Sequence, residues 1–300
     1  MKERHMILVM LVILIILVLR FILGADTQEA ISQEPISFGT NEELAVFVTL
    51  ENQIARAEGA IGEDIESKKT PDYVNRYPNL YANPRTEWNS IEDGVKICYL
   101  TFDDGPSENT LKVLDVLDQY KIKAIFFVIG EEIELNDKNK EILKEISDRG
   151  HMIALHTYCH DYRTIYASVD AFLADYERVF NVIEEITGQR PYIYRFPGGS
   201  YNSSAKRVRK DIVEEMERRG FIYYDWNVSG EDSVGTPSSY TIMKNVKRDL
   251  TRYQLPVVLL HDGQTNQVTA KALSKIIEMI SEKGYAFGRL DERFPCQFRW

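Results

Sequence analysis

An α/β fold, a barrel or near-barrel of parallel strands covered by helices, is the fold class that the sequence predicts. From residue 95 onward, short runs rich in β-branched and aromatic residues alternate with amphipathic helical stretches. The runs are almost continuously apolar, which is typical of parallel strands buried on both faces. Seven such runs favour a barrel, with an open doubly wound sheet as the alternative.

Residues 1–25 are predicted to be a membrane anchor or a signal segment. Arg20 is the single charged residue between positions 6 and 23, and a helix of this length spans about 27 Å, close to the hydrocarbon core of a bilayer. Lys2 and Arg4 precede it, which favours an exported body. No good cleavage site follows. We therefore expect a single-pass protein of the cell membrane with its domain outside the cytoplasm, and secretion after cleavage is the alternative.

Residues 26–94 are predicted to connect this segment to the domain. Residues 26–39 are polar and contain Pro and Gly, as linkers do. Residues 41–66 carry an apolar stripe with helical spacing, so this helix either joins two chains in a homo-oligomer or, more commonly, lies on the main domain. Residues 71–89 are rich in Tyr, Pro and Asn, and they either line a groove or wrap over the core.

The predicted domain covers residues 95–300. Its strands are expected at residues 96–102, 123–129, 152–155, 192–195, 221–226, 256–260 and 285–289. Its helices are expected at residues 107–120, 138–149, 169–187, 203–219, 240–253 and 269–283, where apolar residues recur every three or four positions.

Composition excludes some functions. With 44% hydrophobic residues the chain can bury a sizeable core, and a net charge of −10 argues against a nucleic-acid partner. The three cysteines Cys98, Cys159 and Cys296 define no disulfide framework, because an odd number leaves at least one unpaired within the chain.

Ionisable side chains follow four of the predicted strands at their carboxyl ends. In parallel α/β folds, catalytic and binding residues lie at this edge of the sheet. The side chains here are those of Asp103, Asp104, His156, His160, Arg195 and His261. Random placement would put such groups mostly on the exposed faces of helices. Their convergence predicts a functional site at one end of the sheet.

The adjacent carboxylates Asp103 and Asp104 repel each other unless a positive group lies nearby. His156 and His160 are four residues apart, a common spacing for metal ligands. Two imidazoles and one carboxylate, with an open position for water, are typical of catalytic zinc sites. One aspartate would then bind a metal ion, and Arg195 could stabilise the charge of the other. A helix cap and turn at the two aspartates is the alternative.

Four motifs resemble, in this order, those of the polysaccharide deacetylase family, whose members carry the NodB-homology domain and form carbohydrate esterase family 4. They are TFDDGP (101–106), HTYCH (156–160), RFPGGS (195–200) and LLHD (259–262). The resemblance covers about residues 95–290 and implies a distorted (β/α)7 barrel.

The resemblance also implies an activity. It is metal-dependent removal of N-acetyl groups from a cell-wall polysaccharide, such as the N-acetylglucosamine or N-acetylmuramic acid of peptidoglycan. One divalent ion is implied, Zn²⁺ first and Co²⁺ or another ion otherwise. An O-acetyl esterase acting on a glycan, or a non-catalytic glycan-binding protein with the same fold, are the alternatives.

Roles follow by motif position. The resemblance implies that Asp104, His156 and His160 bind the metal, that Asp103 is the general base and that His261 is the general acid. Cys159, between the two histidines, has no role in the family pattern.

The remaining motif residues would support the reaction. Arg195 would tether Asp103, and the backbone N–H of Gly198, between Pro197 and Gly199, would complete an oxyanion hole. Leu260 would help to form the pocket for the acetyl methyl group.

One family motif is altered. Ser229 and Ser233 replace the usual Asp and Trp of this motif, so the support of His261 and the shape of the acetyl pocket are open questions. Asp232 is retained and is the candidate partner of His261. Trp226, at the end of the preceding strand, either packs in the core or stacks on a sugar ring.

Overall fold

The computed structural model describes residues 72–83 and 94–298. The predicted anchor at 6–23, the linker at 26–39 and the helix at 41–66 lie outside these residues. Within the described ranges, no helix has the length and apolar character needed to cross a bilayer.

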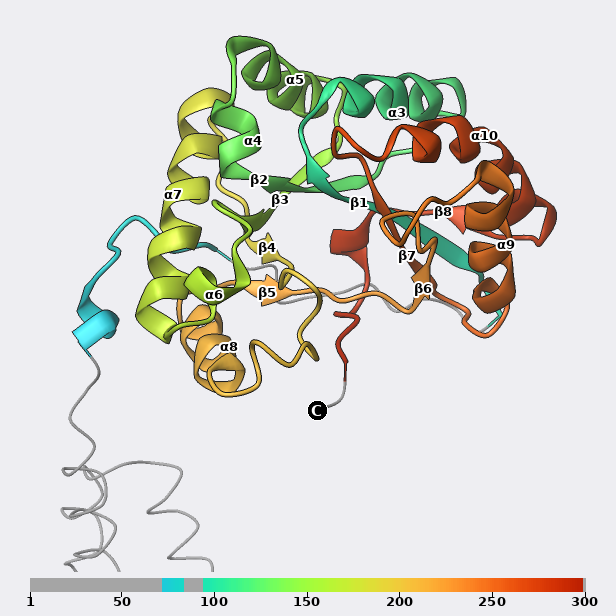
Figure 1. Cartoon of the computed structure of the whole chain (residues 1–300). Coiled ribbons are helices and arrows are strands. Elements are labelled where there is room, and N and C mark those ends of the chain that lie inside the picture. The colour runs from blue at the N-terminus through green and yellow to red at the C-terminus, as the bar shows by residue number, and fades with distance from the viewer. Residues whose placement is uncertain (1–71, 84–93, 299–300) are drawn as a thin grey trace, which may run out of the picture. The chain divides into compact units, whose positions relative to one another are not determined.

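A curled parallel sheet of eight strands forms the centre of the domain (Figure 1). The strands are β1 (Ile97–Gly105), β2 (Ile125–Ile129), β3 (Met152–Thr157), β4 (Ile193–Tyr194), β5 (Ile222–Tyr223), β6 (Val228–Ser229), β7 (Val257–His261) and β8 (Ala286–Phe287). Their order is β5-β4-β3-β2-β1-β7-β6, and β8 pairs with the start of β1. The predicted α/β class and parallel sheet are therefore confirmed.

The sheet is an open half-barrel, and the predicted count of seven strands was wrong. The apolar run at 221–226 contains only β5, after which the chain crosses to a separate short strand, β6. Among the described residues β5 and β6 form no ladder with each other, so the ring of hydrogen-bonded strands stays open there. Periodicity reports which residues are buried, but it does not report which strands pair.

Residues 293–298 lie at this opening without forming a strand. Cys296 O accepts a hydrogen bond from the N–H of Asp225 at 2.6 Å, and Gln297 donates to the carbonyl of Tyr223 at 3.3 Å. The N–H of Phe298 donates to the Asp225 carboxylate at 2.8 Å. This segment therefore satisfies polar groups that a neighbouring strand would otherwise meet.

Helices surround the outside of the sheet (Figure 1). They are α3 (Glu108–Gln119), α4 (Gly130–Glu134), α5 (Asp137–Asp148), α6 (Tyr162–Ile165), α7 (Val169–Thr187), α8 (Arg209–Arg218), α9 (Ser239–Leu250) and α10 (Gln267–Glu282). All six predicted helices are present, although α8 begins six residues later than expected. The single-turn helices α4 and α6 were not predicted, because one turn is too short to show a period.

Local signals explain where the long helices begin and end. Ser107 caps α3 through a capping box with Thr110, and Ser168 caps α7 by accepting from the N–H of Ala171. Gly188 ends α7 in the left-handed conformation that glycine adopts most easily. Each of the two serine N-caps stabilises its helix by about 1 kcal/mol.

The strands that carry the predicted site extend farther than their apolar runs. β1 continues through Asp103 and Asp104, β3 ends after His156, and β7 ends at His261. In the register of the sheet, Asp103 lies between Phe127 of β2 and His261 of β7. The polar residues end the apolar pattern but not the hydrogen-bonded ladder, which fixes their directions.

Arg219, directly after α8, holds the segment 72–83 against the domain. The guanidinium is buried and pairs with Glu215 at 2.6 Å. Its other nitrogens donate to the carbonyls of Tyr73, Arg76, Tyr77 and Leu80. The described part of the Tyr- and Pro-rich stretch thus wraps over the core, which was one of its two predicted uses.

Replacing Arg219 by Met is expected to lower the free energy of unfolding by about 3 kcal/mol, because four carbonyls lose their donor and Glu215 keeps only its pair with Arg218. Urea unfolding of the full chain in detergent would measure the change. The matched control is Arg252→Met, since Arg252 is an exposed arginine that pairs with Asp249 at the surface. Equal stability of the two variants would contradict the role of Arg219.

Candidate active site

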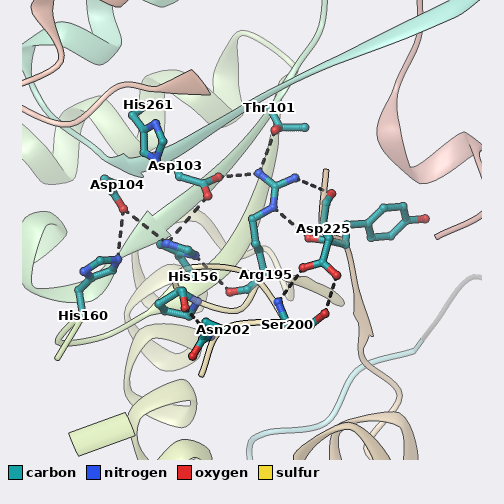
Figure 2. A network of polar contacts seen from close by, with 12 residues as sticks. Thr101, Asp103, Asp104, His156, His160, Arg195, Ser200, Asn202, Asp225 and His261 are labelled. Carbon is teal, nitrogen blue, oxygen red and sulfur yellow. Dashed lines mark hydrogen bonds and ion pairs between the residues drawn. The ribbon is translucent and has the colours of Figure 1, made fainter. Parts of the chain in front are cut away.

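The carboxyl ends of β1, β3, β4 and β7 bring the predicted site residues together (Figure 2). Asp103 and Asp104 come from β1, His156 from β3 and His261 from β7, while Arg195 follows β4 directly. In Figure 2, Asp104 faces the rings of His156 and His160, and Asp103 faces Arg195. Parallel strands end at one edge of the sheet, so residues far apart in sequence meet there.

Three side chains offer ligand atoms to one point. Asp104 Oδ1 lies 3.4 Å from His156 Nε2 and 3.5 Å from His160 Nε2, and the three ligand atoms all lie within 4.8 Å of one another. Asp104 Oδ1 is buried and has no hydrogen-bond partner. A buried acceptor of this kind is costly unless a positive group meets it. The donor set therefore fits one divalent metal ion.

Different contacts place the two histidines. His156 Nδ1 lies 3.1 Å from the carbonyl oxygen of Arg195, and a proton on Nδ1 leaves the lone pair of Nε2 free for a metal. His160 lies in a turn with φ +51°, not on a helix, and its N–H donates to Thr157 Oγ1 at 3.2 Å. This turn, and not a helical repeat, aims the two rings the same way.

The surroundings of Asp104 and His160 favour the protonation states in which these side chains bind a metal. Burial alone would raise the pKa of Asp104, but the facing ring and charge of His156, with the charges of His261 and His160, lower it overall. Burial, together with the neighbouring His156, lowers the pKa of His160. At neutral pH Asp104 is therefore a carboxylate and His160 an uncharged imidazole, and these are the states that bind metals.

Asp103 is held by Arg195 in a buried ion pair. Arg195 Nη1 donates to Asp103 Oδ1 at 2.7 Å and to the hydroxyl of Thr101 at 2.9 Å. Its Nε and Nη2 donate to the carbonyls of Tyr224 and Asp225, which fixes the guanidinium plane. Asp103 Oδ2 stays unbound by Arg195, 3.9 Å from His156 Nε2.

His261 is paired with Asp232. The ring Nδ1 of His261 lies 2.8 Å from Asp232 Oδ1, and the backbone N–H of His261 donates to Asp232 Oδ2 at 2.8 Å. Burial by itself would lower the pKa of His261, but the hydrogen bond and charge of Asp232 outweigh it and raise the pKa to about 9. The hydroxyl of Ser229 accepts from the N–H of Glu231 instead. His261 thus has a carboxylate partner despite the altered motif.

The loop after Arg195 depends on its glycines. Gly198 has φ +74° and Gly199 has φ +80°, which favour glycine over other residues. A methyl group on Gly198 would lie 2.7 Å from the Tyr162 hydroxyl, so a side chain has no room there. The N–H and hydroxyl of Ser200 donate to Asp225 at 2.8 and 2.6 Å and hold the end of the loop.

The remaining predicted residues contact neighbouring parts of the domain. Trp226 packs edge-on against Phe298, with ring centroids 5.2 Å apart, and its ring also faces Gly199. Pro197 O accepts from the hydroxyl of Tyr166 at 2.8 Å. Leu260 is fully buried on β7. Trp226 is partly exposed and lines a surface cavity with Asn227 and Ser229, so both of its predicted uses stay open.

Residues that the sequence motifs did not predict also support the site. Thr101 contacts Arg195, and the hydroxyl of Tyr176 donates to the carbonyl of Arg195 at 2.9 Å. Asp175 contacts the loop that carries His160. The signal for Asp175 was present: it is a carboxylate within the otherwise apolar buried stripe of α7.

Comparisons with known proteins agree with these motifs. Residues 90–216 match the protein family described as polysaccharide deacetylase. The chain is 32% identical over 205 residues to the protein YheN of Bacillus subtilis, covering 66% of this chain and 68% of that protein. It is 30% identical over 210 residues to a peptidoglycan-N-acetylglucosamine deacetylase of Bacillus cereus, covering 68% and 73% of the two chains.

A solved structure extends the likeness to the fold. The catalytic domain of a peptidoglycan N-acetylglucosamine deacetylase from Eubacterium rectale is 35% identical, with a TM-score of 0.65. The match covers 71% of this chain and 97% of that one. At this identity both the sequence and the architecture are shared.

Replacing Asp232 by Asn is expected to lower the pKa of His261 from about 9 toward its ordinary value, because burial is then opposed only by the charges of Asp103 and Asp104. The protonated form of His261 is consequently lost at a lower pH. Titration of the histidine ring signals by NMR in the metal-free full chain would measure this. A His261 pKa unchanged by the substitution would contradict the pairing.

Proposed function

Because the chain belongs to the polysaccharide deacetylase family, we propose that it removes N-acetyl groups from N-acetylglucosamine or N-acetylmuramic acid units of peptidoglycan. Membership of the family makes it a hydrolase of acetylated sugars. The observation that carries the proposal is the convergence of Asp104, His156 and His160, with Asp103 held beside them by Arg195. Amide hydrolysis is accelerated by an activated water and by a carboxylate beside it that takes the proton of that water.

We assign Asp103 the role of general base. Arg195 occupies Oδ1 of Asp103, so Oδ2 is the oxygen that accepts a proton from the attacking water. A divalent cation bound by the three ligand side chains would activate that water and polarise the acetyl carbonyl. Zn²⁺ is the proposed ion, because two imidazoles and one carboxylate are a frequent catalytic zinc set.

We assign His261 the role of general acid. With its pKa raised to about 9, against the effect of burial, by the contact with Asp232, its imidazole is protonated at neutral pH. It can then donate a proton to the sugar nitrogen, which leaves poorly as an anion. The N–H of Gly198 is assigned to the oxyanion and Leu260 to the wall of the acetyl pocket.

Peptidoglycan is the proposed polymer for two reasons. The relatives described above from Bacillus cereus and Eubacterium rectale are peptidoglycan N-acetylglucosamine deacetylases. In addition, an anchor at residues 6–23 would hold residues 95–300 outside the cell membrane, where this polymer lies. Cleavage within residues 1–25 would instead give a secreted enzyme with the same substrate.

The full chain, purified in detergent, is expected to release acetate from peptidoglycan and from N-acetylglucosamine oligomers. Release should stop with a chelator and return when Zn²⁺ or Co²⁺ is added. Substrates carrying only O-acetyl groups should release less. Failure to release acetate from every acetylated glycan, with either ion supplied, would contradict the proposal, while preference for O-acetyl groups would make the protein an esterase.

Replacing Asp103 by Asn is expected to lower acetate release by about 10²–10⁴-fold, because the water then lacks its proton acceptor. Metal content, measured by elemental analysis, should stay unchanged, because Asp103 is not assigned as a ligand. Asp137→Asn is the matched control, since Asp137 is an almost fully exposed carboxylate on α5. Full activity of Asp103→Asn would exclude this residue as the base.

A further inference from the structure

The loop between β3 and α6 determines the position of His160. It must turn His160 back beside His156, and the two ring centroids lie 5.3 Å apart. His160 adopts φ +51°, a left-handed backbone that residues other than glycine rarely take up. Such a conformation persists only where the surrounding contacts determine it. The contacts that hold this loop are therefore part of the metal site.

Asp175, on α7, supplies those contacts. Its Oδ1 accepts from the hydroxyl of Thr157 at 2.6 Å and from the N–H of Tyr158 at 2.7 Å. Its Oδ2 accepts from the N–H of Cys159 at 3.0 Å. The hydroxyl of Thr157 in turn accepts from the N–H of His160 at 3.2 Å. One carboxylate thus satisfies, directly or through Thr157, three consecutive N–H groups after the end of β3.

The charge of Asp175 is stabilised by hydrogen bonds from this part of the chain. The residue is buried, and no ion pair joins it to a cation in the described ranges 72–83 and 94–298. Arg178, one turn further along α7, lies over the ring of Tyr158 at 3.5 Å from its centroid. A buried carboxylate without a cation depends on the donors that surround it. Here those donors come from Thr157, at the end of β3, and from the next two residues of the loop.

We propose that Asp175 is a positioning residue for the metal ion, acting through the loop that carries His160. Its carboxylate accepts from three donors at once, and these bonds fix the backbone conformation from which His160 Nε2 reaches the position opposite Asp104. An amide at this position offers one acceptor oxygen and turns an N–H₂ group toward the other donors. The inference rests on the metal site of the proposed function.

The test measures binding of Zn²⁺ and Co²⁺ by the metal-free full chain in detergent, without reference to activity. Asp175→Asn is expected to weaken Zn²⁺ binding by about 10–100-fold, the usual effect of losing support behind a ligand, and to change the visible absorption of bound Co²⁺. The matched control is Asp170→Asn, because Asp170 lies on the same helix in an exposed pair with Arg76. This control should bind both ions as the unaltered chain does.

A second pair of variants separates positioning from folding. Thr157→Val removes the hydroxyl that joins Asp175 to His160 but keeps the shape of the side chain, and it should weaken Zn²⁺ binding. Thr157→Ser keeps the hydroxyl and should restore it. Unchanged Zn²⁺ affinity in both Asp175→Asn and Thr157→Val would overturn the inference. Absence of Zn²⁺ and Co²⁺ binding by the unaltered chain would overturn the metal site itself, and the inference with it.

Discussion

The buried ion pair between Arg195 and Asp103 is the interaction on which the arrangement of the site depends. Asp103 and Asp104 are neighbours at the end of a central strand, so both carboxylates would repel each other in a poorly solvated place. Arg195 offsets the charge of the first and fixes its direction, while two imidazoles face the second. The same guanidinium binds carbonyls beyond β5, which ties the site to the far edge of the sheet.

Four carboxylates of one chemical kind acquire different properties from their surroundings. The pKa of Asp104 is lowered by imidazoles despite its burial, whereas burial raises the pKa of Asp262 to about 7, only partly opposed by the hydroxyl of Thr110. Asp175 binds backbone N–H groups, and Asp232 binds an imidazole. Position in the fold, more than residue type, therefore decides which carboxylate can bind a metal, accept a proton or orient a neighbour.

The sequence was informative where a local pattern carries the signal. Apolar runs and amphipathic stretches located the main strands and helices, and the strand-end residues His156 and His261 lie where the four motifs predicted. Contacts between distant segments left no such pattern. The open edge between β5 and β6 and the contact of Asp175 with the loop of His160 depend on how the chain closes in space. The short helices α4 and α6 were not predicted because a single turn is too short to show the spacing of apolar residues that marks a helix.

Residues 293–298 contact the same carboxylate that holds the glycine loop of the site. Phe298 and Ser200 share the carboxylate of Asp225, so a stretch of irregular backbone beyond α10 is bonded to the same anchor as the glycine loop beside Arg195. Truncation of the chain before Phe298 would therefore remove one of the donors to Asp225, and the glycine loop would lose part of the anchor that it shares with this tail.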